Sequence, residues 1–203
     1  QSPSVRGVVF CNELLDAMPV HRLGWDARKR AWFEWGVGVS GEKFAWVQMP
    51  VAIEASAQSL RFRFQLAVCP FDLAAELLDV LPDGFTVEIS PAALNWWQEA
   101  AGALECGKLL TFDYGLSADQ FFTPERGAGT LRAYHRHRLC ADVLANVGEQ
   151  DLTAHVNFTA LQAVGKTAGL KTEELLTQGQ LLTRIAKQTG EKRDVFGDWA
   201  PER

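Results

Sequence analysis

Acidic side chains follow two apolar runs of the sequence, at positions where a catalytic or binding group could be held. Residues 5–11 are followed by Asn12-Glu13, and residues 108–112 by Asp113-Tyr114. In open α/β sheets, ligands bind at the carboxyl ends of the strands. Carboxylates at those ends could hold hydroxyl groups or an amine of a cofactor, or a cationic substrate. They could equally be capping and turn residues, and their spacing does not separate the two interpretations.

Glu13 and Asp16 are three residues apart. If the segment after the first run is helical, both carboxylates point to one side. Such a pair suits a guanidinium group, whose donors form a rigid fork. The alternative is the solvated first turn of a helix, where acidic residues are common because they complement the helix dipole.

A concentrated run of positive side chains occupies residues 132–138 and could bind a carboxylate, a phosphate or an acidic partner surface. If the run is one strand, alternation places one set of side chains on the same face, namely Arg132, Tyr134, Arg136 and Arg138. A solvated edge strand is the alternative. His135 and His137 have no third ligand at a matching spacing, so no metal site is expected.

His155 is a candidate for handling a proton or orienting a substrate, because histidine titrates near neutral pH. It follows closely after Asp151 and precedes Asn157, which can cap a helix. A histidine satisfied by hydrogen bonds in the core is the alternative. The tryptophans of residues 25–46 could likewise form a binding face or cover a core.

Charge and composition exclude several classes of protein. Twenty Lys and Arg against 25 Asp and Glu give a net charge of -5, which argues against generic binding to nucleic acid. No apolar run approaches the roughly 20 residues of a membrane span. The four cysteines are widely spaced without a Cys-x-x-Cys pair, so neither zinc nor a disulfide framework is indicated, and reduced thiols in the cytoplasm are expected.

The elements that would position these residues indicate an α/β fold. Residues 5–11 read as a doubly buried parallel strand because they are β-branched and uninterrupted. Ser90 and Pro91 open a helix whose apolar face runs to Leu104, and Gly107 is expected to end it. A strand over 108–112 follows, and a helix leading into a parallel strand is typical of an α/β sheet.

Other segments carry weaker signals. The sequence predicts an antiparallel ribbon over 25–51, a strand over 60–66, a short helix over 72–81 and a loop over 116–129. It also predicts an extended segment over 130–138, a strand or turn over 151–157 and a helix over 158–168 that Gly169 ends. A strand over 170–176, a helix over 180–188 and a loose tail over 191–203 complete the chain.

Six strings of the sequence share their order and spacing with one family of enzymes. They are residues 12–22, 88–91, 113–115, 129–138, 148–158 and 177–179. On these strings the chain resembles the MidA family of S-adenosylmethionine-dependent methyltransferases, over about residues 5–180. Mitochondrial members of that family are complex I assembly factors that methylate an arginine of a complex I subunit.

The resemblance implies a seven-stranded, Rossmann-like methyltransferase sheet. The strand over 5–11 would be the fourth of that sheet and the strand over 108–112 the fifth, with residues 23–68 as a Trp-rich β insertion. Expected catalytic residues are Glu13, Asp16 and His155. Cofactor contacts are expected from Asn12, Asp113 and Tyr114, and substrate contacts from Asn157, Arg132 and Tyr134, with no metal.

In the MidA family, which the chain resembles, the glycine-rich cofactor loop precedes the Asn-Glu motif. Residues 1–190 are therefore expected to be the C-terminal part of a methyltransferase domain, with an incomplete S-adenosylmethionine site. The expected partner is a protein substrate such as a respiratory complex subunit. Exposed sheet edges favour association, so a homodimer is one expected form. The location would be the cytoplasm, or the mitochondrial matrix in a eukaryote. The alternative function is a non-catalytic module that binds or assembles a protein partner.

Overall fold

The computed structural model describes residues 4–51, 55–56, 59–60 and 75–190. The chain divides into two compact units, residues 1–171 and 172–203, and each is considered by itself. The predicted strand over 60–66 lies outside the described residues except for Leu60, and so do residues 72–74 of the predicted helix and the predicted tail over 191–203. The described elements mix helices with small sheets, which confirms the α/β class but not a seven-stranded sheet.

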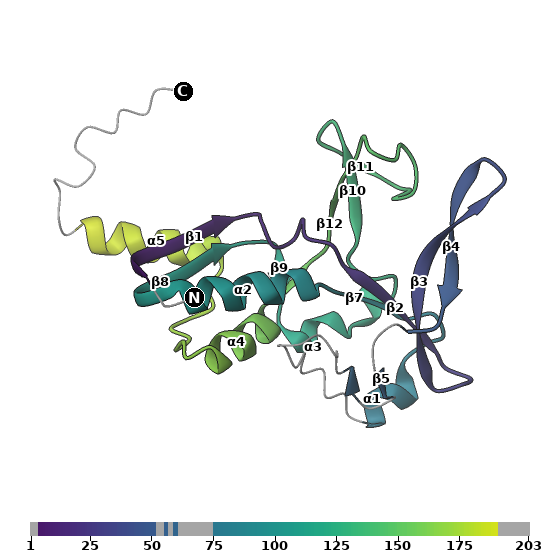
Figure 1. Ribbon diagram of the computed structural model, residues 1–203, viewed down its shortest axis with the longest axis horizontal. Coiled ribbons are helices and arrows are strands. Elements are labelled where there is room, and N and C mark those ends of the chain that lie inside the picture. Colours follow the sequence, from purple (N-terminus) through teal and green to yellow (C-terminus); the bar gives the residue numbers. More distant parts are fainter. Residues whose placement is uncertain (1–3, 52–54, 57–58, 61–74, 191–203) are drawn as a thin grey trace. The chain divides into compact units, whose positions relative to one another are not determined.

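The two strands that carry the acidic ends lie side by side (Figure 1). β1 (Val5–Asn12) pairs in parallel with β8 (Leu104–Phe112), and the register places Asn12 opposite Phe112. The predicted parallel strands are therefore confirmed, and their carboxyl ends coincide.

The prediction that the first strand is doubly buried is wrong. Val8 is 63% exposed and Phe10 53% exposed. The prediction assumed a sheet covered on both faces, as parallel sheets ordinarily are. The exposure of Val8 and Phe10, which alternation places on one face, shows that this face of β1 is not covered by the described residues.

The helix that leads into β8 begins as the sequence predicts and ends earlier. α2 (Pro91–Ala103) is capped by Ser90, whose hydroxyl accepts a hydrogen bond from the Ala93 amide at 3.2 Å. The helix passes directly into β8 at Leu104. Gly107 therefore does not end the helix. It lies within β8 opposite Gly7, and a Cβ atom there would stand 1.8 Å from the Gly7 carbonyl oxygen.

A four-stranded antiparallel sheet follows the order β4-β3-β2-β7. Its strands are β2 (His21–Asp26), β3 (Ala31–Ser40), β4 (Lys43–Met49) and β7 (Thr86–Ile89), and the first three confirm the predicted Trp-rich ribbon. Buried side chains of β2, β3 and β7 join the core, among them Leu23, Trp25, Trp32 and Val87. Leu78, from the short helix α1 (Ala75–Val80), belongs to the same core. β5 (Ala55–Ser56) and β6 (Ser59–Leu60) form a separate antiparallel pair.

The segment predicted as a loop over 116–129 contains short helices. β9 (Gly115–Leu116) is followed by α3 (Ala118–Phe121) and a 3-10 helix η1 (Pro124–Arg126). A reciprocal capping box between Ser117 and Gln120 supports the single turn of α3.

The predicted extended run over 130–138 is a hairpin, not one strand. β10 (Arg132–His135) pairs with β11 (Arg138–Cys140), and also with β12 (Asp151–Thr153). Arg136 and His137 form the turn with φ of 50° and 61°. The turn removes the continuous face expected for Arg132, Tyr134, Arg136 and Arg138, and the sequence lacks the Asn-Gly signal that would have indicated it.

The last helix of the first unit matches its prediction. α4 (Phe158–Thr167) follows β13 (Val156–Asn157), which pairs in parallel with β9. Gly169 follows the helix with φ of 89°. In the second unit, α5 (Gln178–Gly190) begins two residues before the predicted start. The predicted strand over 170–176 is wrong, because no described strand pairs with it. Of the helices described, none has the length and apolar character needed to cross a membrane.

We expect Gly107→Ala to lower the free energy of unfolding by at least about 2 kcal/mol, because φ is +144° and the new methyl group would meet the backbone of Gly7. Gly102→Ala is the matched control. Its Cβ would meet nothing within 4 Å, and alanine should stabilise the end of α2 by about 0.5–1 kcal/mol. Urea unfolding of both variants checks this, and equal midpoints would contradict the close approach of β1 and β8.

Candidate functional site

Backbone hydrogen bonds join the loops that follow the two parallel strands. The Glu13 amide donates to the Phe112 carbonyl at 2.8 Å. The Leu15 amide donates to Asp113 Oδ2 at 2.9 Å, across 98 positions of sequence. The two acidic loops are therefore fixed to each other, as the shared strand ends predicted.

A third segment, residues 154–157, joins this pair of loops. The Ala154 amide donates to the Asp16 carbonyl at 2.9 Å, and the Val156 amide donates to the Tyr114 carbonyl at 2.8 Å. His155 lies between these two anchored residues. The structure thus brings the predicted residues of three separate segments into one neighbourhood.

The segment after β1 is a turn rather than the helix that the pairing of Glu13 with Asp16 assumed. Glu13 has φ of 47°, in the left-handed region that side chains other than glycine and asparagine rarely adopt. Leu15 is 1% exposed and belongs to the hydrophobic core. Because Asp113 holds the Leu15 amide, the chain turns inward here, and Asp16 becomes buried.

Asp16 is a buried carboxyl group among other carboxylates. Asp16 is only 6% exposed. Burial, the charge of Asp113, a hydrogen bond with Asp113 and the charge of Glu13 together raise the pKa of Asp16 to about 6. Negative charge is thus concentrated at the ends of β1 and β8, which favours binding of a cation.

The other residues at the strand ends are more accessible. Asn12 and Glu13 are exposed, and Tyr114 is 61% exposed. Asp113 accepts hydrogen bonds from the Leu15 amide and, through Oδ1, from the Tyr114 amide at 2.9 Å. Asp113 therefore shapes the two loops, while its neighbours face solvent and could contact a ligand.

His155 is half-buried, and its Nδ1 atom is shielded from solvent without a hydrogen-bond partner in the part of the chain that the structure describes. Burial, with smaller effects from the charges of Arg132 and Arg126, holds the pKa of His155 below its usual value. The imidazole is therefore neutral at pH 7 and can accept a proton. It lines a cavity of about 30 Å³, together with Glu88, Ser90 and Asn157 among others.

The three residues predicted to contact a substrate have different surroundings. Asn157 Oδ1 accepts a hydrogen bond from the Ala160 amide at 3.0 Å and caps α4, so part of its side chain has a structural role. Arg132 is exposed on β10, close enough to influence the pKa of His155. Tyr134, also on β10, lies opposite Asp151 of β12.

Sequence reasoning missed a buried polar group beside this site. Glu88 is 3% exposed on β7, between the buried Val87 and Ile89. Its partners are Arg22 and Thr130. A charged residue between Val87 and Ile89 was the available signal, because such a group requires dedicated partners when it is buried.

We expect Asp16→Asn to stabilise the fold at pH 7.5 by about 1–3 kcal/mol, since the wild-type carboxyl ionises there at a cost. The folded-state pKa of about 6 lies above the unfolded value near 3.8. The free energy of unfolding of the wild type should therefore fall as pH rises from 4 to 6, and the variant should lack this slope.

Asp26→Asn is the control for this experiment. Hydrogen bonds from Lys29 hold the pKa of Asp26 below its usual value, so its replacement should destabilise at neutral pH. Urea unfolding between pH 4 and 8 measures both variants. An Asp16→Asn protein with unchanged stability at pH 7.5 and an unchanged pH slope would contradict the account of the cluster.

A comparison with known proteins identifies the family to which the chain belongs. Residues 1–176 match a family model described as "Putative S-adenosyl-L-methionine-dependent methyltransferase". Among curated proteins, none matches the chain.

Two crystal structures of one superfamily, both from Burkholderia thailandensis, are similar. One is a "likely methyl transferase" bound to S-adenosyl-homocysteine, with 30% identity and a TM-score of 0.66 over 83% of this chain. The other is an uncharacterized protein with 28% identity and a TM-score of 0.75 over 98% of this chain.

The chain spans 40% and 48% of the lengths of these two proteins. The family model covers well over half of the present chain. The chain belongs to this family of S-adenosyl-L-methionine-dependent methyltransferases.

Proposed function

We propose that the chain is the C-terminal part of a methyltransferase domain that transfers a methyl group to a guanidinium nitrogen of a protein arginine. The observation that carries the proposal is the carboxylate cluster of Glu13, Asp16 and Asp113 at the shared ends of β1 and β8. Burial first, and the neighbouring carboxylates second, raise the pKa of Asp16, so a cation that binds beside the cluster stabilises its ionised form. A guanidinium group is such a cation, and carboxylates match its fork of donors.

The ends of the same two strands also carry the residues that we propose for the cofactor of the family. S-adenosylmethionine, when bound, supplies a methyl group on a positively charged sulfur, and the attacking nitrogen takes the methyl carbon as the carbon–sulfur bond breaks. Asn12, Asp113 and Tyr114 are the residues of this chain proposed to hold it, since they lie at the strand ends and two of them are exposed. The coverage of less than half of the related chains supports the proposal that residues outside this chain complete the cofactor site.

Each acidic residue of the cluster has a distinct proposed role. Glu13 is exposed and would accept hydrogen bonds from the substrate guanidinium. Asp16 is buried, within range of the charge of Glu13, and would supply negative charge to the same group. His155 is half-buried and neutral at pH 7, and its imidazole would accept the proton that the nitrogen loses and then release it to water.

The identity of the methylated protein rests on the resemblance to the MidA family, whose mitochondrial members act on a complex I subunit. We therefore propose a respiratory complex subunit as the substrate. The homodimer and the cytoplasmic or matrix location stay predictions.

A second candidate function has one observation in its favour. Antiparallel register places Val37 opposite Trp46 and Val39 opposite Phe44, on one face of the β3–β4 hairpin. Val37, Val39 and Phe44 are 52%, 74% and 48% exposed. Apolar side chains gathered in this way are typical of a surface that binds another protein. A non-catalytic assembly module would use this face, whereas Trp32 is buried and belongs to the core.

We expect Glu13→Gln, introduced into the full-length enzyme, to lower the rate of methyl transfer by about 10²–10³-fold, because a neutral amide stabilises the guanidinium far less. Cofactor affinity, measured by calorimetry with S-adenosylhomocysteine, should stay unchanged. Glu42→Gln is the control, since Glu42 is exposed in the turn between β3 and β4.

The two candidate functions predict opposite results for paired variants. Retained transfer by Glu13→Gln would contradict its proposed role. A combined Val39→Ser and Phe44→Ser variant should retain transfer of methyl to free arginine-containing peptides if the chain is catalytic. If the unmodified protein transfers no methyl group, and the Val39→Ser and Phe44→Ser variant loses a partner that Glu13→Gln still binds, the assembly module is the better account.

A further inference from the structure

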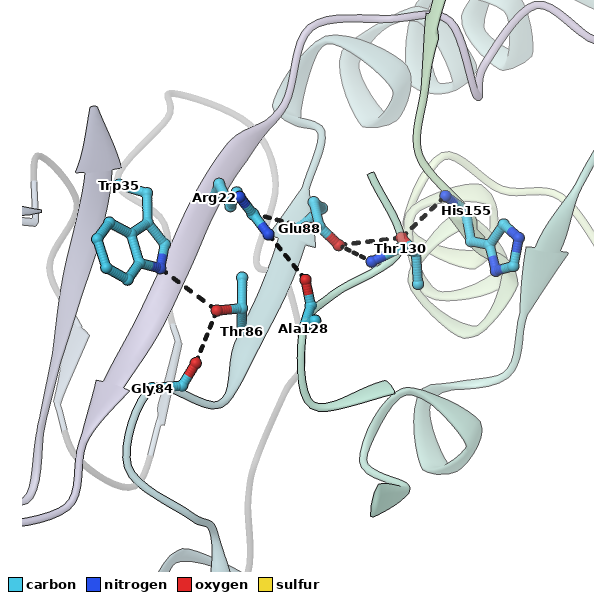
Figure 2. Close-up of polar contacts among 8 residues, drawn as sticks. All are labelled: Arg22, Trp35, Gly84, Thr86, Glu88, Ala128, Thr130 and His155. Carbon is cyan, nitrogen blue, oxygen red and sulfur yellow. Dashed lines mark hydrogen bonds and ion pairs between the residues drawn. The ribbon is translucent and has the colours of Figure 1, made fainter. Parts of the chain in front are cut away.

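A buried carboxylate, Glu88, lies at the centre of a chain of hydrogen bonds that ends at His155 (Figure 2). Its Oε2 atom accepts hydrogen bonds from the Thr130 amide at 2.6 Å and from the Thr130 hydroxyl at 3.0 Å. Its Oε1 atom accepts one from Arg22 Nε at 3.3 Å. All three partners are donors, so a group with two acceptor atoms fits this place, and a side-chain amide does not.

The Thr130 hydroxyl connects Glu88 to the candidate site. A hydroxyl group has one hydrogen, and Thr130 gives it to Glu88. A lone pair of the same oxygen accepts the hydrogen bond from the His155 amide at 3.1 Å. Glu88 therefore fixes the orientation in which Thr130 meets the backbone of His155.

The loop that carries Thr130 is fitted closely to Glu88. Gly129 has φ of +82°, and a Cβ atom there would stand 2.2 Å from Glu88 Oε1. Arg22 also holds the loop, since its Nη2 atom donates to the Ala128 carbonyl at 2.8 Å. The Arg22 guanidinium also lies over the Trp46 ring, 4.7 Å from its centroid. Arg22 is thus fixed by three separate contacts and in turn fixes Glu88.

Three consecutive amides hold the segment that contains His155. Those of Ala154 and Val156 donate to the backbone carbonyls of Asp16 and Tyr114. The His155 amide donates to a side chain, the Thr130 hydroxyl. The position of the histidine backbone thus depends on side chains that lie outside the loops of the carboxylate cluster.

We propose that Thr130, oriented by Glu88, is a positioning residue that fixes the backbone of His155 against the carboxylate cluster. The geometric part of this inference is independent of the reaction. Its consequence for methyl transfer rests on the proposed function, in which His155 accepts a proton.

The test is amide hydrogen exchange, measured residue by residue by nuclear magnetic resonance on the full chain. Thr130→Val removes the hydroxyl and keeps the shape, whereas Thr130→Ser keeps the hydroxyl. We expect the His155 amide to exchange about tenfold faster in Thr130→Val, the effect of losing one hydrogen bond, and within about twofold of wild type in Thr130→Ser. Thr130→Ala serves the same purpose if the valine variant does not fold.

The amides of Ala154 and Val156 are the internal controls, because their acceptors are backbone carbonyls. Their exchange rates should stay unchanged when the exchange rate of the His155 amide rises. An unchanged His155 rate in Thr130→Val, or equal acceleration of all three amides, would overturn the inference.

A double-mutant cycle tests the part assigned to Glu88. Glu88→Gln should accelerate exchange at His155, because the glutamine side chain has one NH2 group, which would face a donor, Thr130 or Arg22, in either orientation. It should add nothing in the Thr130→Val background, where the connecting hydroxyl is absent. Equal acceleration in both backgrounds, or no effect in either, would overturn the role of Glu88.

Methyl transfer by the full-length enzyme separates this inference from the proposed function. If the positioning by Thr130 and the proposed role of His155 are both correct, Thr130→Val lowers kcat about tenfold without changing the KM for cofactor. Thr130→Ser then restores kcat. If exchange at His155 changes as expected and kcat does not, the positioning stands and the catalytic role of His155 is contradicted. If neither changes, the positioning itself is contradicted.

Discussion

The hydrogen bond from the Leu15 amide to the Asp113 carboxylate is the constraint on which the candidate site depends. It requires the parallel register of β1 and β8, which brings two loops 98 positions apart to the same place. By holding Leu15 inward it also buries Asp16 beside Asp113, where the two carboxyl groups repel each other. Burial, together with the charges of Asp113 and Glu13, raises the pKa of Asp16, and a cation bound there would stabilise the ionised carboxylate.

Hydrogen bonds between residues distant in sequence also hold the segment around His155. Its neighbours are anchored to the carboxylate loops through backbone atoms, and His155 itself is anchored through Thr130. A proton acceptor works only when it is held at hydrogen-bond distance from the proton that it removes. Buried polar contacts such as the one between Glu88 and Thr130 are costly to leave unsatisfied, so they fix one geometry.

Local signals predicted the elements, and contacts between distant residues decided the site. The caps at Ser90 and Asn157 follow from residues adjacent in sequence, and so do the strands themselves, though not their pairing. The turn at Glu13 cannot be predicted from adjacent residues, because it depends on Asp113. The exposure of β1 cannot be predicted from them either, because it depends on what covers the strand. The partners of Glu88 are 42 and 66 positions away, so only its charge between Val87 and Ile89 could have indicated them.

The central claim is that a cation binds against the carboxylate cluster. Carbon-13 nuclear magnetic resonance of the Asp16 carboxyl group in the full-length enzyme, titrated with and without an arginine-containing peptide, tests it most directly. The account predicts a titration midpoint near 6 without ligand and a clearly lower midpoint with it, since a positive charge nearby favours the ionised form. An unchanged midpoint in an enzyme that binds the peptide would place the positive charge elsewhere and contradict the account.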